Sequence, residues 1–160
     1  MANRRRVLTL GLLGALLARE ADATDCAAES GVGARLLERY VAAANAHDTG
    51  VFAELFTESY VQHSGRGPSG LAAQIENFRG IFARMPDVQA RVEDRIIAGD
   101  KVVARMTFSA THTQPLQGIA PTGRRFTLRT IDIWRVENGK LAEHWDIVDY
   151  AGLQKQLRGE

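Results

Sequence analysis

Two aspartates lie in the middle of neighbouring segments that have the composition of β-strands. Asp132 lies within TLRTIDIWRV (127–136), and Asp146 lies within LAEHWDIVD (141–149). Aspartate is a poor strand former, and its carboxylate costs free energy when desolvated unless it is paired or used. Two carboxylates close together cannot both ionise cheaply, which suits a general acid beside a general base. Asp146 and Asp132 are therefore the first candidates for catalysis.

The Asn138-Gly139 dipeptide between these segments predicts a β-hairpin with a tight turn. Because side chains alternate along a strand, each aspartate shares its face with two neighbours. These neighbours are Thr130 and Trp134 in the first segment, and His144 and Val148 in the second. If the two faces look the same way, both carboxylates are presented to one cavity.

Upstream, a short predicted strand at Tyr60–His63 precedes a loop rich in glycine, proline and serine at 64–70. Pocket mouths are often found where a strand ends at such a loop, so we expect His63 to share proton transfer with the aspartates. Apolar side chains around Asp146 would favour this chemistry. We expect a small hydrophobic substrate to contact six residues: Gln62, Phe78, Phe82, Thr130, Trp134 and His144.

Structural roles for the same residues remain open at this stage. Asp146 is alternatively a structural carboxylate paired with Arg129, and Asp132 is alternatively bridged to Arg105 or Arg129 across the sheet. His63 is alternatively a surface residue, and Trp134 a core residue. Neither H-x-x-x-H nor H-x-H spacing occurs within one predicted element, so we expect no metal.

The order of the predicted elements indicates an α+β fold. Amphipathic helices are expected at 33–45, 49–56 and from Ser69, a plausible N-cap, to Pro86. Strands at 88–97 and 101–113 follow, then the hairpin and a short tail helix at 150–157. Helices followed by long antiparallel strands predict helices packed on one face of a curved sheet, with a pocket at its open end.

Composition limits the classes of function. A chain of 160 residues has room for one domain with one core, and a formal net charge of +1 argues against a nucleic-acid surface. A single cysteine excludes an internal disulfide framework. The sequence has no phosphate-binding loop, dinucleotide fingerprint or serine-hydrolase elbow, so we expect no cofactor.

The first 23 residues resemble a targeting segment. Arg4, Arg5 and Arg6 precede an apolar run too short to span a bilayer, and the string RRRVLT resembles a twin-arginine export motif. We therefore expect a cleaved signal at 1–23, a flexible mature N-terminus at 24–32, a domain at 33–157, and export to the periplasm or medium. An amphipathic helix or a mis-assigned start codon, with a cytoplasmic protein, is the alternative.

Several motifs together resemble the SnoaL-like polyketide cyclase family, often called ester cyclases. They are YVQH, MPD, THT with GIAPTGR, IDIWRVENGKLAEHWDIVD and GLQKQL, and they cover roughly 36–157. The resemblance implies a cone-shaped α+β barrel, similar to ketosteroid isomerase and nuclear transport factor 2. It also implies ring closure by intramolecular aldol condensation, without metal or cofactor. Asp146 matches the family's acid/base, whereas Asp132 stands where a histidine is expected and Gln62 where an asparagine is expected.

Two classes of function follow. The first is cofactor-free acid/base catalysis on a small hydrophobic carbonyl compound by a cyclase, or by an isomerase, dehydratase or epoxide hydrolase on the same scaffold. The second is a non-catalytic, exported ligand-binding protein, in which salt bridges would occupy both carboxylates. In either case Ile133, Trp145 and Ile147 leave an apolar convex face, which predicts a homodimer.

Overall fold

The computed structural model describes residues 31–160. The predicted export signal and all but the last two residues of the predicted flexible N-terminus lie outside the described residues, so export stays a prediction. Residues 31 and 32, which the sequence analysis assigned to the flexible segment, are already helical. Within the described range, none of the helices combines the length and apolar character needed to cross a membrane.

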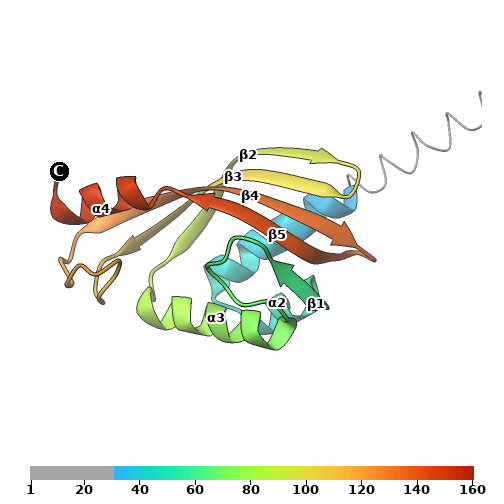
Figure 1. Cartoon of the computed structure of the whole chain (residues 1–160), viewed down its shortest axis with the longest axis horizontal. Coiled ribbons are helices and arrows are strands. Elements are labelled where there is room, and N and C mark those ends of the chain that lie inside the picture. The colour runs from blue at the N-terminus through green and yellow to red at the C-terminus, as the bar shows by residue number, and fades with distance from the viewer. Residues whose placement is uncertain (1–30) are drawn as a thin grey trace, which may run out of the picture.

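The α+β prediction is confirmed. A helix described over 31–46 is followed by three further helices and five strands. Their bounds are α2 Thr49–Leu55, β1 Phe56–Gln62, α3 Leu71–Arg84, β2 Gln89–Ala98, β3 Lys101–Thr111, β4 Arg125–Glu137, β5 Lys140–Val148 and α4 Tyr150–Arg158. In Figure 1 the long strands β2–β5 form one layer, and α2 and α3 lie opposite them.

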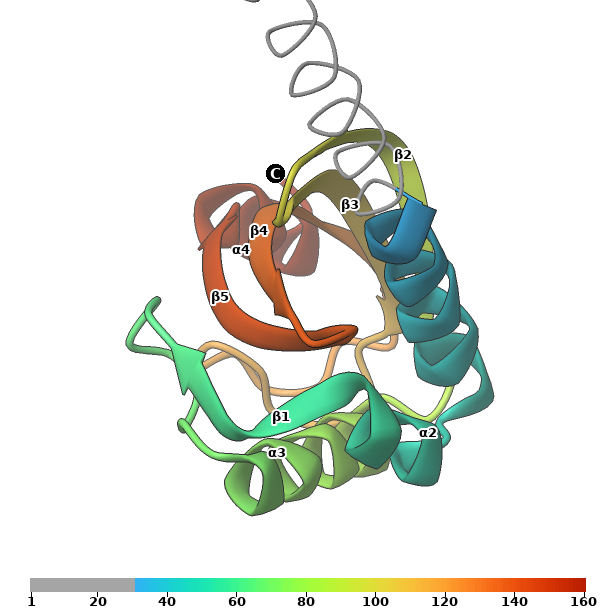
Figure 2. The same cartoon turned by 90° about the vertical axis from the view of Figure 1, so that its right-hand side faces the viewer.

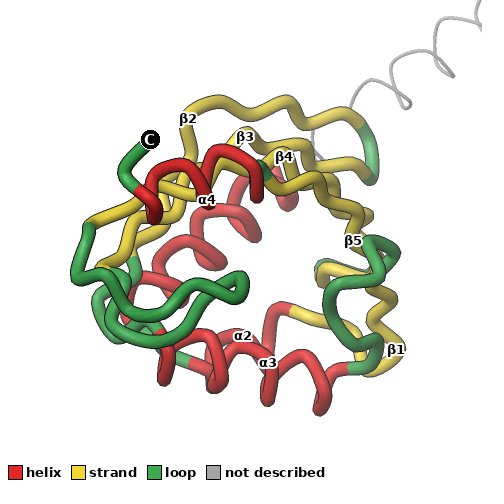
Figure 3. The backbone as a smooth tube through the Cα atoms, turned by 60° about the vertical axis from the view of Figure 1, so that its left-hand side comes forward, coloured by secondary structure: helices red, strands yellow, loops and turns green. Residues whose placement is uncertain are grey.

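The five strands form one curved sheet in the order β1-β5-β4-β3-β2. Strands β2 to β5 pair in antiparallel fashion, and β1 joins the edge by a parallel pairing with β5. Register shifts interrupt three of the four pairings, and bulges of this kind bend and twist a sheet. Figures 2 and 3 show the result: the sheet wraps around one side, and α2 and α3 lie opposite β2–β4.

Aromatic side chains hold the helices against the concave face. The Phe52 and Phe78 rings stack at 4.0 Å between centroids, and Tyr40 packs edge-on against Phe52 at 5.2 Å. Tyr40 also contacts Trp134 of β4 at 5.3 Å. Offset and edge-to-face pairs of this kind add stability beyond their buried area. The cluster therefore fixes the helices relative to the strand that carries Asp132.

The strand before the glycine-rich loop is longer than expected. We predicted that the second helix would include Phe56, but Phe56 begins β1, which continues to Gln62. Phe56 and Tyr60 are both buried, because residues four apart on a strand share a face. The predicted N-cap at Ser69 is wrong: Gly70 occupies that position without a side-chain cap, and Ser69 Oγ instead accepts a hydrogen bond from Gln62 N.

The predicted hairpin is confirmed as β4–β5. Asn138 and Gly139 both have positive φ, 50° and 73°, which is the backbone that a two-residue hairpin turn requires. On the convex face, Ile131 and Ile147 are half or more exposed, as is Ile96 of β2. The homodimer through this face stays a prediction.

We expect Phe52→Ala to lower the free energy of unfolding by about 3–5 kcal/mol, because Phe52 is fully buried and stacked on Phe78. Urea denaturation followed by circular dichroism measures this loss. Lys140→Ala, at an exposed hairpin position, is the control and should change stability by less than about 0.5 kcal/mol. Equal effects of the two variants would contradict the central role of the aromatic cluster.

Candidate active site

A cavity of about 330 Å³ lies between the concave face of the sheet and α3. Its volume falls in the range of small-molecule sites. The apolar wall comes from both layers and includes Phe78, Ile81, Phe82, Phe108, Phe126, Leu128 and Val148. The polar lining is concentrated near β1, β4, β5 and the glycine-rich loop and includes Gln62, Ser64, Arg66, Thr130, Asp132, His144 and Asp146.

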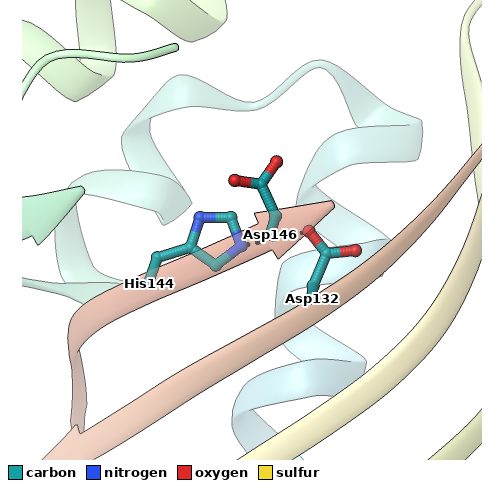
Figure 4. A group of neighbouring side chains, drawn as sticks. All are labelled: Asp132, His144 and Asp146. Atoms are coloured by element: carbon teal, nitrogen blue, oxygen red, sulfur yellow. Dashed lines mark hydrogen bonds and ion pairs between the residues drawn. The ribbon is translucent and has the colours of Figure 1, made fainter. Parts of the chain in front are cut away.

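The two aspartates lie directly opposite each other on β4 and β5. Side chains at such positions have Cβ atoms about 4.5–5.5 Å apart. Figure 4 shows Asp132, His144 and Asp146 projecting from adjacent strands to the same side, and all three line the cavity. The structure therefore brings the two predicted carboxylates together, through a register shift between Arg135 and Val136 that moves the β4–β5 pairing by one residue.

A chain of hydrogen bonds satisfies Asp132, which is 4% exposed. Gln62 Nε2 donates to His144 Nδ1 at 2.9 Å, which leaves the imidazole proton on Nε2. His144 Nε2 then donates to Asp132 Oδ1 at 3.0 Å, and Thr130 Oγ1 donates to Asp132 Oδ2. The His144 ring stacks on Trp134 at 4.8 Å, which fixes its plane. Both oxygens of Asp132 are thus occupied by protein groups.

Asp146 is satisfied on one side only. Arg66 Nη2 donates to Asp146 Oδ2 and, at 3.2 Å, to the main-chain oxygen of the same residue. The other carboxylate oxygen, Oδ1, is buried and has no hydrogen-bond partner among the described residues. A buried carboxylate oxygen without a donor is costly in a native structure and calls for an explanation. Here Oδ1 belongs to a residue that lines the cavity.

Two buried tyrosines report the negative charge around this pair. Burial raises the pKa of Tyr60, and the charges of Asp146 and Asp132 raise it further. Burial likewise raises the pKa of Tyr40, with Asp132 as the next largest cause. Both phenols therefore stay neutral at physiological pH. The same field favours a cation near the carboxylates, and Arg66 supplies it.

Five of the six predicted substrate contacts line the cavity: Gln62, Phe78, Phe82, Thr130 and His144. Trp134 does not. It is 1% exposed and belongs to the core beneath His144, so its contact is with the imidazole ring. The prediction of direct substrate contact by Trp134 is not supported by this placement.

His63 also lies away from the cavity. Because neighbouring residues of a strand point to opposite sides, Gln62 points inward and His63 outward. His63 stacks on Trp145 at 4.4 Å, and its Nε2 pairs with Glu143 at 2.7 Å. Hydrogen bonds from His63 and Arg135 hold the pKa of Glu143 below its usual range. His63 thus pairs with Glu143 and does not line the cavity, so this placement does not support the expected proton exchange with the aspartates.

Sequence reasoning missed Arg66, which we had assigned only to a loop. Arg66 is 80 positions from Asp146 in the chain, and no local pattern links the two residues. The salt-bridge partners that we named as alternatives for the two aspartates, Arg105 and Arg129, are also wrong. Asp146 pairs with Arg66, and Asp132 pairs with His144. The sequence feature that could have pointed to Arg66 is its position between Gly65 and Gly67, just after the strand that carries Gln62.

The ligand atoms of Asp132, His144 and Asp146 lie within 4.8 Å of one another, so their geometry would admit a divalent cation. Carboxylate and imidazole ligands suit several such ions. A cation bound by these groups would, however, compete with Arg66 for Asp146 and with the hydrogen-bond chain for Asp132. In this arrangement, the guanidinium supplies the positive charge.

The fold and the acid-lined cavity define an α+β barrel of the kind found in nuclear transport factor 2. The family model of the SnoaL-like polyketide cyclase matches residues 34–157. The chain is 30% identical to the aklanonic acid methyl ester cyclase DauD of Streptomyces sp. (strain C5) over 131 residues, or 76% of this chain and 79% of the relative. It is also 30% identical to the aklanonic acid methyl ester cyclase DnrD of Streptomyces peucetius, across 76% of this chain and 88% of that relative.

Among solved structures, TsrD from Streptomyces laurentii superposes with a TM-score of 0.73 at 33% identity, covering 79% of this chain and 95% of TsrD. The chain belongs to the SnoaL-like polyketide cyclase family. Its cyclase relatives are consistent with an enzyme of lyase or isomerase type.

We expect His144→Phe to lower the free energy of unfolding by about 1–3 kcal/mol. Phenylalanine keeps the stacking on Trp134 but removes the N–H that donates to buried Asp132. Urea denaturation followed by tryptophan fluorescence measures the difference.

The matched control is His63→Phe, which keeps the stacking on Trp145 and removes only a partly exposed pair with Glu143. This variant should lose no more than about 1 kcal/mol. If the two variants lose equal stability, the hydrogen bond from His144 is not what compensates Asp132.

Proposed function

We propose that this protein closes a ring in an ester-bearing polyketide by intramolecular aldol condensation, with Asp146 as the acid/base and without a metal or organic cofactor. The observation that carries the proposal is the asymmetry of the two carboxylates. Asp132 has a protein donor on each oxygen, whereas Asp146 has one oxygen held by Arg66 and one buried without a partner. The substrate class comes from the cyclase relatives.

The proposed reaction needs one proton to leave and return. Asp146 Oδ1 takes a proton from a methylene carbon that is activated by neighbouring carbonyl groups, and the electron pair moves onto a carbonyl oxygen. The resulting enolate carbon attacks a ketone carbon of the same molecule, and a carbon–carbon bond forms. Asp146 then returns the proton to the new alkoxide, so substrate and product are isomers. Proton transfer by a positioned side chain contributes typically about 10²- to 10⁴-fold in rate.

The apolar wall supports the second requirement, which is a folded substrate. Ring closure within one molecule is accelerated when the reacting carbons are held within contact distance. Phe78 and Phe82 of α3 face the sheet across the cavity, and Leu128 and Val148 lie on the sheet side. Apolar side chains on two sides suit a planar aromatic substrate. We assign substrate orientation to this apolar slot and hydrogen bonding to its polar end.

The Asp132–His144 pair supplies the polar end beside Asp146. In the related cyclases, the position of Asp132 is expected to hold a histidine, and here an imidazole reaches the same region from β5. We assign this pair to holding the substrate carbonyl or a product hydroxyl in register with Asp146. Both carboxylates form salt bridges, Asp132 with His144 and Asp146 with Arg66, as the ligand-binding alternative predicts. The buried Oδ1 of Asp146, which has no partner among the described residues, is the observation that favours catalysis.

We expect Asp146→Asn to lower kcat for ring closure of an aklanonic-acid-type methyl ester by about 10²- to 10⁴-fold, because asparagine cannot accept the methylene proton. Conversion is measured by chromatography of substrate and cyclised product. Chelation of divalent cations should leave the wild-type rate unchanged.

Asp149→Asn is the matched control, three positions along the same segment. Asp149 caps α4 through Gly152 N, and asparagine caps helices equally well, so activity should be retained. An Asp146→Asn enzyme within ten-fold of wild type, or a rate abolished by chelation, would contradict the proposed mechanism.

A further inference from the structure

We propose that Arg66 is a catalytic residue that binds the enolate oxygens of the substrate after Asp146 has taken the proton, and that it thereby selects substrates with a 1,3-dicarbonyl unit. The inference rests on the proposed function, since it concerns the same proton transfer. It assigns a second charged group to the reaction and a chemical feature to the substrate.

Arg66 is held at the polar end of the cavity by its loop. The C-terminal end of the loop is tied to β1 by two hydrogen bonds, from Gln62 N to Ser69 Oγ at 3.0 Å and from Gly70 N to Tyr60 O at 2.6 Å. The guanidinium also lies over the Tyr150 ring, 5.7 Å from its centroid. Arg66 lines the cavity and pairs with Asp146, so its charge is placed beside the proton acceptor.

The guanidinium has donors to spare. Arginine carries five N–H groups, and both hydrogen bonds to Asp146 come from Nη2. Among the residues that the structure describes, Nη1 and Nε have no hydrogen-bond partner. Two neutral donors beside the aspartates are already used, because Gln62 Nε2 serves His144 and Thr130 Oγ1 serves Asp132. Arg66 is the charged donor beside Asp146 that has N–H groups left for a new anion.

Charge conservation explains why this arrangement suits the step. Before the transfer, Arg66 neutralises the Asp146 carboxylate. As the C–H bond breaks, the proton goes to Oδ1 and the electron pair to the carbonyl oxygen, so the negative charge moves from enzyme to substrate. Arg66 then exchanges one anionic partner for another at the same place. Donors positioned where charge develops are worth typically about 10²- to 10³-fold in rate.

The shape of the guanidinium points to the substrate class. Its planar fork matches anions with two oxygens in one plane, as in carboxylates. A 1,3-dicarbonyl enolate also places two conjugated oxygens in one plane and on one side. Arg84, the other arginine that lines the cavity, is exposed at the end of α3 and folds back beside Gly80. The fork of Arg66 is thus the one directed to the acid/base.

The test uses a stable mimic of the enolate in a variant that mimics the protonated base. The probe is 1,8-dihydroxyanthraquinone, whose ionised hydroxyl and adjacent ketone reproduce the two-oxygen anion and whose visible absorbance shifts on ionisation. In Asp146→Asn, Arg66 has lost its carboxylate partner, so the bound dye should ionise at a lower pH than in water. Adding Arg66→Gln should weaken binding of the ionised dye by about 10- to 100-fold.

Arg66→Lys in the same background keeps the charge but loses the planar fork, and its affinity should fall between the two. Arg79→Gln, at an exposed α3 residue paired with Glu76, is the matched control and should not change dye binding. Circular dichroism verifies that each variant is folded. Equal affinity with and without Arg66, or a dye that stays neutral in Asp146→Asn, overturns the inference.

The two proposals fail separately in this design. Retained ring closure by Asp146→Asn would contradict the proposed function, whatever the dye does. Loss of ring closure in Asp146→Asn, together with dye binding that does not depend on Arg66, would leave Asp146 as the acid/base and remove Arg66 from the reaction.

Discussion

The two carboxylates that face each other across β4 and β5 impose the main constraint on this structure. Like charges at directly opposed strand positions destabilise a sheet, and burial adds to the cost. Asp132 and Asp146 meet this constraint in different ways. Asp132 is compensated by rigid neighbours on its own sheet, His144 and Thr130. Asp146 depends on Arg66, which comes from a loop and reaches one oxygen. This difference leaves one buried carboxylate oxygen, Oδ1 of Asp146, without a partner among the described residues.

The rest of the fold holds the groups around these two carboxylates in place. The aromatic cluster around Tyr40 and Phe52 fixes the helices against Trp134, and Trp134 in turn fixes the plane of His144. Gln62 lies on β1, the edge strand that pairs in parallel with β5. It donates to Nδ1 of His144 and so leaves the imidazole proton on Nε2. The imidazole is thus held from two sides. Groups held this firmly need little reorganisation during a reaction, which is the main source of electrostatic catalysis.

Much of this site could be predicted from the sequence because its core is local. The Asn138-Gly139 turn starts the pairing, but a register shift between Arg135 and Val136 moves it by one residue. This shift, which the sequence pattern did not predict, places Asp132 opposite Asp146 on one face. His63 was misplaced for the same physical reason, since its inward neighbour Gln62 leaves it facing outward. The pairing of Arg66 with Asp146 could not be predicted, because it depends on how a loop folds against a strand 80 positions away. Local periodicity carries no information on such contacts.

An imidazole lies beside Asp132 although that position does not supply one. Asp132 stands where the resemblance predicts a histidine. In an antiparallel pair, however, the residue two places from the directly opposed one is a diagonal neighbour within reach of long side chains. His144 holds that position relative to Asp132, and its Nε2 lies 3.0 Å from the carboxylate. The imidazole therefore reaches the cavity from β5, and Asp132 fixes which of its nitrogens carries the proton.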